Sequence, residues 1–406
     1  MKPASIGWRA VEPDGRRART RLGDTIGSSG CRGEVRVVTG ELSRRIVLGV
    51  GAGVGAALAV GTPSFARTAA REESRSLDEL YRAAVAESGK LVVYAGGDRS
   101  LQQDAVAAAF RARFPEIDIK IVVDYSKFHD VRINNQLVTN TLVPDVVQLQ
   151  TLQNFPRWKR EGQLLPYKPA GFGKVYDGFK DADGAWLAIN VFAFSFIYDV
   201  AAVGGHAPTS PKALTDPRWR GRIASAYPND DDATLFLFKR YAETYGWSWI
   251  AELAQQQLAF ARGSYTPAEA VAQGRQALGV GGSGDPRVSS PTKWVVPATD
   301  PFMAWGQRAA ILSRAQNPAA AKLYLNWLLS TERQRLAFNG WSVRTDVAPG
   351  AGLRPIWTYR NADLDGFPAF MADRAEVERW RQTFSLYFGE VVGAPTPGRL
   401  GLHPGR

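Results

Sequence analysis

Glycines and polar side chains follow three short apolar runs in the first half of the chain. Gly97 and Asp98 come after the first run, Tyr125 after the second and Gln150 after the third. A glycine lets a ligand approach the backbone closely, and carboxylate, phenol and amide groups can form hydrogen bonds with that ligand. A glycine would also suit an ordinary turn, so both a solute-binding site and a structural turn fit this pattern.

Aromatic and acidic residues follow further apolar runs in the second half. Tyr227 and Asp230 come after one run, and Tyr265 comes after another. Together with Tyr94 and Tyr125, these tyrosines offer stacking area and a polar tip to a solute. Asp230 opens a run of three acids, which has an ordinary role too, because acids stabilise the first turn of a helix. Of the three, we expect Asp230 to cap the helix or contact a ligand.

The motifs of common enzymes are absent from the sequence. It contains no Gly-x-Ser-x-Gly elbow, no His-Glu-x-x-His pair and no Walker loop. The only cysteine is Cys31, and the three histidines, His129, His206 and His403, are far apart in sequence. We therefore predict no catalytic residue, no metal site and no cofactor. A secreted enzyme is kept as the alternative, since a Ser/His/Asp triad needs no local motif.

The net charge is +11, with an excess of basic residues in both parts of the chain. Residues 1–66 hold 10 Lys and Arg against 5 Asp and Glu, which leaves 40 against 34 for residues 67–406. Because no Lys/Arg run beyond residue 66 resembles a nucleic-acid patch, we expect no nucleic-acid partner.

A leader precedes the globular part. Ser43-Arg44-Arg45 opens an apolar stretch, Ile46–Val60, and a small-residue site follows at Ser64-x-Ala66. This order resembles a twin-arginine export signal, and the stretch is shorter than the ~20 residues of a membrane-spanning helix. It predicts a product exported to the periplasm, with an uncleaved anchor as the alternative. Residues 1–40 fit neither a signal nor a fold, so we expect translation to start nearer Val37 or Val38.

The periodicity of apolar residues predicts alternating strands and helices that would position these side chains. Expected elements of the first half are a helix over 77–88, a strand over 91–95, a helix from Ser100, a strand over 117–125, a helix over 130–139 and a strand over 144–149. Such alternation is typical of a parallel sheet with right-handed crossovers. Ligands bind at the carboxyl ends of such strands, which is where Asp98, Tyr125 and Gln150 fall.

Trp186–Asp199 is apolar at nearly every position and has no Gly or Pro inside, which indicates a strand buried on both faces. A complete α/β unit precedes it, and another follows with strands over 223–227 and 258–261. A helix capped by Thr266 then leads to a strand over 277–280. The long strand is therefore either a hinge between two lobes or a core strand of one large α/β domain.

Several motifs resemble, in order, those of the extracellular solute-binding proteins of ABC importers, family 1, which includes ferric-iron-binding proteins. The likeness covers roughly Leu91 to Ala348. It is carried by Leu91-Val92-Val93-Tyr94, Phe110-x-x-x-Phe114-Pro115, Pro144-Asp145-Val146-Val147, Trp158-x-x-Glu161-Gly162-x-Leu164-Leu165-Pro166 and Ile197-Tyr198-Asp199.

The resemblance implies an α/β, periplasmic-binding-protein-like type II fold, with two α/β lobes around a cleft and crossing strands between them. The implied parts are 1–66 as extension and signal peptide, 67–193 with 298–340 as lobe 1, 194–297 with 341–392 as lobe 2, and 393–406 as a flexible tail. It implies a monomer that captures a small-molecule ligand by hinge closure and delivers it to an ABC transporter permease.

The ligand is the open question at this stage. The iron-binding relatives carry an adjacent tyrosine pair in the loop that corresponds to 281–285, and this chain has none there. We rank an organic or organophosphorus solute first, a ferric complex second and a polyamine third. The expected ligand-binding residues are Tyr94, Gly97, Asp98, Tyr125, His129, Tyr227, Asp230, Ser264, Tyr265, Thr266 and Ser283. The resemblance contributes the hydroxyls of 264–266, while Asp98, Tyr125, His129, Asp230 and Tyr265 form an oxygen-rich set for the ferric alternative.

Overall fold

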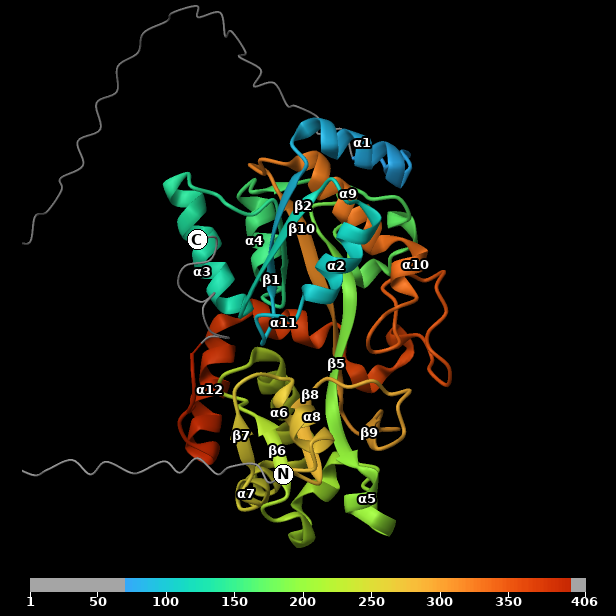
Figure 1. Ribbon diagram of the computed structural model, residues 1–406. Helices are drawn as coiled ribbons and strands as arrows, with labels where there is room; N and C mark the ends of the chain where they lie inside the picture. Colours follow the sequence, from blue (N-terminus) through green and yellow to red (C-terminus); the bar gives the residue numbers. More distant parts are fainter. Residues whose placement is uncertain (1–69, 396–406) are drawn as a thin grey trace, which may run out of the picture. The chain divides into compact units, whose positions relative to one another are not determined.

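A computed structural model describes residues 70–395 of the chain (Figure 1). The predictions for the leader, the translation start and the end of the tail lie outside these residues. Ten strands within 70–395 form one sheet in the order β2-β1-β3-β10-β5-β8-β6-β7, with β4 paired to β10 and β9 paired to β5. No helix of this part of the chain has the length and apolar character that crossing a membrane requires.

We call the elements at the β2 end of the sheet lobe 1 and those at the β7 end lobe 2. Lobe 1 holds β1 (Lys90–Gly96), β2 (Asp118–Asp124), β3 (Val146–Leu149), β4 (Leu164–Leu165), α1 (Leu77–Glu87), α2 (Asp104–Arg113), α3 (Ser126–Thr139), α4 (Asn154–Arg160), α9 (Pro318–Leu329) and α10 (Thr331–Gln334). Lobe 2 holds β6 (Ile223–Ala226), β7 (Ala259–Ala261), β8 (Leu278–Gly282), β9 (Thr292–Val295), α5 (Val200–Val203), α6 (Asp232–Tyr245), α7 (Trp247–Ala254), α8 (Thr266–Ala272), α11 (Gly366–Ala372) and α12 (Arg374–Phe388). Short 3-10 helices are η1 (Phe172–Lys174), η2 (Asp177–Phe179), η3 (Gly204–His206), η4 (Pro211–Thr215), η5 (Pro217–Trp219), η6 (Ile356–Thr358) and η7 (Arg360–Ala362).

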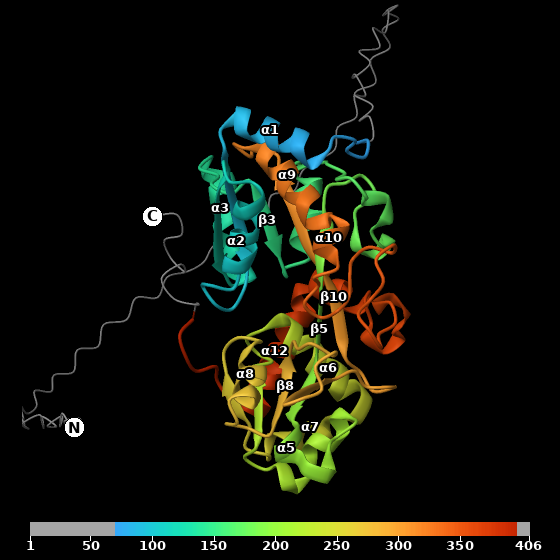
Figure 2. The same cartoon turned by 45° about the vertical axis from the view of Figure 1, so that its right-hand side comes forward.

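Two long strands run between the lobes, β5 (Leu187–Asp199) and β10 (Met303–Leu312) (Figures 1 and 2). β5 pairs with β10 through its first part and with β8 and β9 through its last part. β10 continues to antiparallel pairing with β3. The apolar run predicted as a strand from Trp186 therefore forms the crossing, beginning one residue later.

Each lobe contains three strands that pair in parallel with one another, whereas β4 and β9 pair antiparallel with the long strands. β1 pairs in parallel with β2 and β3, and β6 pairs in parallel with β7 and β8. In lobe 1, Phe110 and Tyr324 pack on one face of the sheet, and Phe155 and Trp158 on the other. Because side chains of a strand alternate between faces, such a doubly covered sheet needs near-continuous apolar runs. This is the pattern the sequence shows.

The chain was expected to pass from lobe 1 to lobe 2 at residue 341, but in the structure it does so later. Trp341 and Val343 join the core cluster of lobe 1, and the Val343 carbonyl accepts the N–H of Tyr176 at 3.0 Å. Trp357 stacks on Tyr176 with 4.9 Å between ring centroids. The region from 341 to 362 therefore packs on lobe 1, because its aromatic side chains fill that core. Helices α11 and α12 pack on α6 of lobe 2, as Figure 1 shows for α12.

Candidate functional site

The carboxyl ends of the three parallel strands of lobe 1 meet at one edge of the sheet. Asp98 follows β1, Tyr125 follows β2 and Gln150 follows β3. The Gln150 N–H donates to Ser126 Oγ at 2.9 Å. A Cβ placed on Gly96 would lie 2.1 Å from the same Oγ, so the chain needs glycine there for the strand ends to approach this closely.

The corresponding loops of lobe 2 lie opposite this edge. Asp230 follows β6, Arg262 directly follows β7, and Ser264 precedes α8. Gly263 has a φ of 93°, a conformation that favours glycine. A Cβ there would lie 3.3 Å from Asp98 Cβ, so the two lobes come into contact at this point.

Direct hydrogen bonds join Asp98 of lobe 1 to Ser264 of lobe 2. The Ser264 backbone N–H donates to Asp98 Oδ2 at 2.7 Å, and the Ser264 hydroxyl donates to the same oxygen at 2.6 Å. Beside them, the Arg99 guanidinium lies over the Tyr265 ring, 4.7 Å from its centroid. These contacts form one side of the inter-lobe site.

Lys127 and Gln150 form the other contacts with lobe 2. Lys127 Nζ donates to Asp230 Oδ1 at 2.7 Å and to the Asp230 carbonyl at 3.0 Å. Gln150 Nε2 donates to Asp231 Oδ2 at 3.4 Å. Arg262 Nη1 lies 3.6 Å from Asp230 Oδ1. Asp230 is thus held between one basic side chain from each lobe.

The three acids of the run have different roles in the structure. Asp231 caps α6, since its Oδ1 accepts the N–H of Thr234 at 2.7 Å. Asp232 pairs with Arg381 of α12, and Asp230 alone contacts the opposite lobe through a salt bridge. Asp230 therefore does not cap α6, since its neighbour Asp231 does, and Asp230 instead faces lobe 1.

Burial and like charges raise the pKa values of the acidic groups at this site. Burial raises the pKa of Asp98, its hydrogen bonds from Ser264 oppose this, and the carboxylate of Asp230 adds to the increase. For Asp231, burial and then the charge of Asp98 raise the pKa to about 6. Burial, followed by the charges of Asp98 and Asp230, raises the pKa of the Tyr125 phenol. Three acidic groups therefore resist ionisation when the lobes are together.

Two expected ligand contacts, Tyr94 and His129, lie in the interior of lobe 1. Both are fully buried, and their rings stack with 4.6 Å between centroids. His129 Nε2 lies 3.1 Å from the Val122 carbonyl and Nδ1 lies 2.8 Å from Arg132 Nη1. Burial lowers the pKa of His129 to about 3. Because α3 begins at Ser126, earlier than predicted, His129 points into the core, and we withdraw both residues from the site.

Four other expected contacts have structural partners. The Tyr227 ring is buried and stacks on Phe260 at 5.0 Å, and Ser283 Oγ donates to the Ala193 carbonyl at 3.0 Å. Thr266 Oγ1 donates to the Gly263 carbonyl at 2.8 Å, and Thr266 lies inside α8 instead of capping it. A Cβ on Gly97 would lie 2.7 Å from Val123 Cγ1, so packing explains this glycine.

Five of the predicted residues are brought together: Asp98, Tyr125, Asp230, Ser264 and Tyr265. Their partners Arg99, Lys127, Gln150, Asp231 and Arg262 were not among the expected ligand contacts, although Gln150 was recognised as a residue at a strand end. These residues could have been found from their position in the sequence, because each lies at or next to the carboxyl end of a predicted strand, where ligands bind. Within residues 70–395 no group of three or more His, Cys, Asp or Glu side chains is arranged to hold a metal ion.

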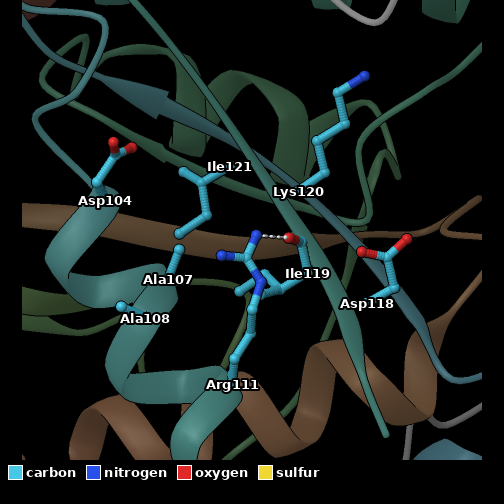
Figure 3. Close-up of a pocket in the computed structure, with 8 residues that line it drawn as sticks. All are labelled: Asp104, Ala107, Ala108, Arg111, Asp118, Ile119, Lys120 and Ile121. Carbon is cyan, nitrogen blue, oxygen red and sulfur yellow. Dashed lines mark hydrogen bonds between the residues drawn. The ribbon is translucent and has the colours of Figure 1, made fainter. Parts of the chain in front are cut away.

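A surface cavity of about 530 Å³ lies elsewhere, between α2 and the edge strand β2 (Figure 3). Asp104, Ala107 and Arg111 line it from the helix, and Arg111 Nη2 donates to the Ile119 carbonyl at 2.7 Å. The guanidinium thus occupies part of the free strand edge, an arrangement that protects edge strands from unwanted pairing. This cavity contains no residue of the inter-lobe site.

A family model for bacterial extracellular solute-binding proteins matches residues 143–349, just over half of the chain. The chain belongs to this family. Extracellular solute-binding proteins bind small molecules and work with ABC transporter permeases, and their setting is outside the cytoplasmic membrane. The match includes both crossing strands and most of lobe 2.

Similar proteins include one relative known from its sequence and several solved structures. An uncharacterised protein of Haemophilus influenzae is 25% identical over 248 residues, which cover 55% of this chain and 71% of that protein. A substrate-binding protein of an ABC transporter from Agrobacterium tumefaciens is 17% identical, with a TM-score of 0.61 over 74% of this chain and 96% of that one. Iron-bound HitA from Pseudomonas aeruginosa is 18% identical, with a TM-score of 0.57 over 73% and 99%.

A third solved structure is the periplasmic binding protein AfuA from Actinobacillus pleuropneumoniae with fructose-6-phosphate bound. It is 19% identical, with a TM-score of 0.58 over 74% of this solute-binding protein and 99% of AfuA. At these identities the likeness establishes the fold, which is the type II periplasmic-binding-protein fold predicted from the sequence motifs.

Proposed function

We propose that this protein is the substrate-binding component of an ABC importer, which captures a small solute when its two lobes close and then presents it to a membrane permease. The observation that carries the proposal is the set of contacts between strand-end loops of opposite lobes. Asp98 bonds to Ser264, and Lys127 bonds to Asp230. Loops that meet in this way can enclose a solute between them.

The two crossing strands suit a hinge. β5 belongs to the lobe 1 part of the sheet through its pairing with β10 and to the lobe 2 part through its pairing with β8. The register of both pairings shifts, between Gln307 and Arg308 and between Ser195 and Phe196. Bulges of this kind bend a strand and loosen the ladder locally, so a small rotation there would separate the lobes.

An organic or organophosphorus solute fits the site best. Tyr125 and Tyr265 offer aromatic area, and Ser264, Lys127 and Arg262 offer hydrogen-bond donors. The solved relatives include a protein with iron and one with a sugar phosphate, so the shared fold does not select between them. A ferric complex is the second candidate, because the phenols of Tyr125 and Tyr265 lie near the carboxylate of Asp98, and hard oxygen donors suit Fe³⁺.

We further propose that the protein is exported through its twin-arginine leader and acts in the periplasm as a monomer. Replacing Arg44 and Arg45 by lysine is expected to leave the precursor in the cytoplasm, as fractionation and immunoblotting would show. Unchanged export of this double variant would contradict the twin-arginine route. Light scattering of the purified protein is expected to give the mass of one chain.

A thermal-shift screen tests the binding function. The protein is mixed with fructose 6-phosphate, citrate, ferric citrate, glucose or spermidine, and one solute is expected to raise the melting temperature. At a hundredfold excess over the dissociation constant the stabilisation is about 2.7 kcal/mol. Asp98→Ala should abolish the shift, whereas Asp78→Asn, which breaks a salt bridge of 2.6 Å to Arg113 outside the site, should not. A shift that survives Asp98→Ala would show that the site lies elsewhere.

A further inference from the structure

One carboxylate oxygen of the inter-lobe site is shared by two basic side chains. Asp230 Oδ1 lies 2.7 Å from Lys127 Nζ of lobe 1 and 3.6 Å from Arg262 Nη1 of lobe 2. The side chains of Asp230 and Arg262 are 12% and 18% exposed, and that of Lys127 is 34% exposed. This carboxylate oxygen therefore lies within reach of one basic side chain from each lobe.

The two basic groups have more donor capacity than Asp230 uses. Arg262 Nε is buried and has no hydrogen-bond partner, and its distance of 3.6 Å to Asp230 is an ion pair without a short hydrogen bond. A guanidinium has five N–H donors in a planar fork that matches carboxylate and phosphate groups. A buried donor without a partner costs free energy. A ligand that accepted a hydrogen bond from Arg262 Nε would remove this cost and so bind more tightly.

The charges of the surrounding groups also favour an added anion. Lys127 and Arg262 carry two positive charges and Asp230 carries one negative charge, so a net charge of +1 remains. The Arg99 guanidinium lies beside these groups, over the Tyr265 ring. Asp98 and Asp231 are the other acids of the site that form hydrogen bonds across the lobes, and burial raises the pKa of each, which reduces their negative charge in the closed site. Asp230 itself is the group that most directly opposes an incoming anion.

We propose that this protein recognises its solute by an anionic group, a carboxylate or a phosphate, which binds between Lys127 and Arg262 in exchange for the carboxylate of Asp230. The proposal rests on the solute-binding function proposed above and names the chemical class of the solute. Asp230 acts as an internal competitor: it holds the two bases in place, and a solute must match or exceed its interaction to replace it. A neutral sugar or a polyamine cannot make this exchange.

The test compares variants of the full chain by isothermal titration with fructose 6-phosphate, citrate, glucose and spermidine as probes. Asp230→Asn keeps the size of the side chain and removes the competing charge, so it is expected to bind the anionic probes at least tenfold tighter than the wild type. Arg262→Gln and Lys127→Gln are each expected to weaken the same binding at least tenfold. Asp78→Asn, the matched variant at a distant salt bridge, should leave all affinities unchanged. Circular dichroism of each variant checks that it is folded.

The outcomes separate this inference from the function itself. Binding of glucose or spermidine that Arg262→Gln leaves unchanged, together with no binding of either anion, would overturn the inference and leave the solute-binding function standing. Equal or weaker anion binding by folded Asp230→Asn would overturn the role of Asp230 as competitor. Absence of binding of all four probes to both the wild type and Asp230→Asn would count against the anionic class. If X-ray scattering then also showed no change in the lobes across a wider solute screen, the function would fall as well.

Discussion

The hydroxyl of Ser264 provides the most direct test of closure by inter-lobe contacts. Ser264→Ala removes the 2.6 Å hydrogen bond to Asp98 Oδ2 and keeps the 2.7 Å bond from the backbone N–H. A hydrogen bond to a charged group contributes about 1.5–3 kcal/mol. Because this bond exists only when the lobes are together, its loss destabilises the closed state and leaves the open state unchanged. We take the lower figure, because burial and the charge of Asp230 raise the pKa of Asp98 and so reduce its negative charge in the closed state. The ratio of open to closed molecules should then rise about tenfold.

Single-molecule energy transfer between the lobes measures that ratio. Val138 on α3 and Leu386 on α12 are 87% and 86% exposed, which makes both suitable for labelling through cysteine. Cys31, the only natural cysteine, is replaced by serine. The control is Thr358→Val, which removes a 2.7 Å hydrogen bond to the Pro355 carbonyl away from the cleft. An unchanged open fraction in Ser264→Ala without added solute would refute the reasoning that these contacts hold the lobes together.

Three further predictions concern pH, packing and the last helix. Because the pKa of Asp231 is raised from 3.8 to about 6, the folded state binds the extra proton. The free energy of unfolding should therefore fall by on the order of 2–3 kcal/mol as pH rises from 4 to 7, and Asp231→Asn should flatten this slope in urea titrations. Gly282→Ala would place a Cβ 2.2 Å from the Ser264 carbonyl, so we expect a loss of about 1–3 kcal/mol in urea unfolding and weaker solute binding. Phe384→Ala should cost about 3–5 kcal/mol in the same assay, because the ring is fully buried in lobe 2.

Each of these predictions has a contrary outcome. An equally steep pH slope in Asp231→Asn would assign the dependence to other groups. Full solute binding by Gly282→Ala would mean that the position of Ser264 does not matter for the site. A Phe384→Ala variant as stable as the wild type would show that α12 does not contribute to the core of lobe 2. The exposed neighbour Leu386 serves as the control, and Leu386→Ala should change stability by less than about 0.5 kcal/mol.

Local patterns predicted many of the elements and the family resemblance, but not the second crossing strand β10. Trp186–Asp199 is apolar at nearly every position and contains no Gly or Pro, and it forms the crossing strand β5 from Leu187. Helix beginnings were less certain: α2 begins at Asp104, later than the expected start at Ser100, and α3 begins at Ser126, earlier than expected. The start of α3 decides which way His129 points, because each residue turns a helical side chain by about 100°. A difference of a few residues at a helix end therefore moved a predicted ligand contact into the core.

The partners of the site residues could not be predicted from local patterns, because they come from the opposite lobe. Lys127 and Asp230 are 103 residues apart and Asp98 and Ser264 are 166 apart. Each of the four follows or adjoins the end of a strand, and no sequence rule states which strand ends face each other across a hinge. That pairing depends on how β5 and β10 orient the two halves of the sheet.

The closed site also explains why acids and bases occur together in a cleft proposed for anions. If Lys127 and Arg262 faced each other without Asp230, closure would bring two positive charges into a partly buried space, and repulsion would hold the lobes apart. With Asp230 present, the lobes can close on an internal ion pair. A solute gains only the difference between its own interaction with the two bases and that of Asp230. Asp230 therefore lowers the affinity for any anion and raises the discrimination between weak and strong ones, since a weak anion cannot replace it. Removing its charge is therefore expected to strengthen binding and to broaden the range of anions bound. If binding became stronger but the range stayed the same, Asp230 would be a competitor with no role in selecting among anions.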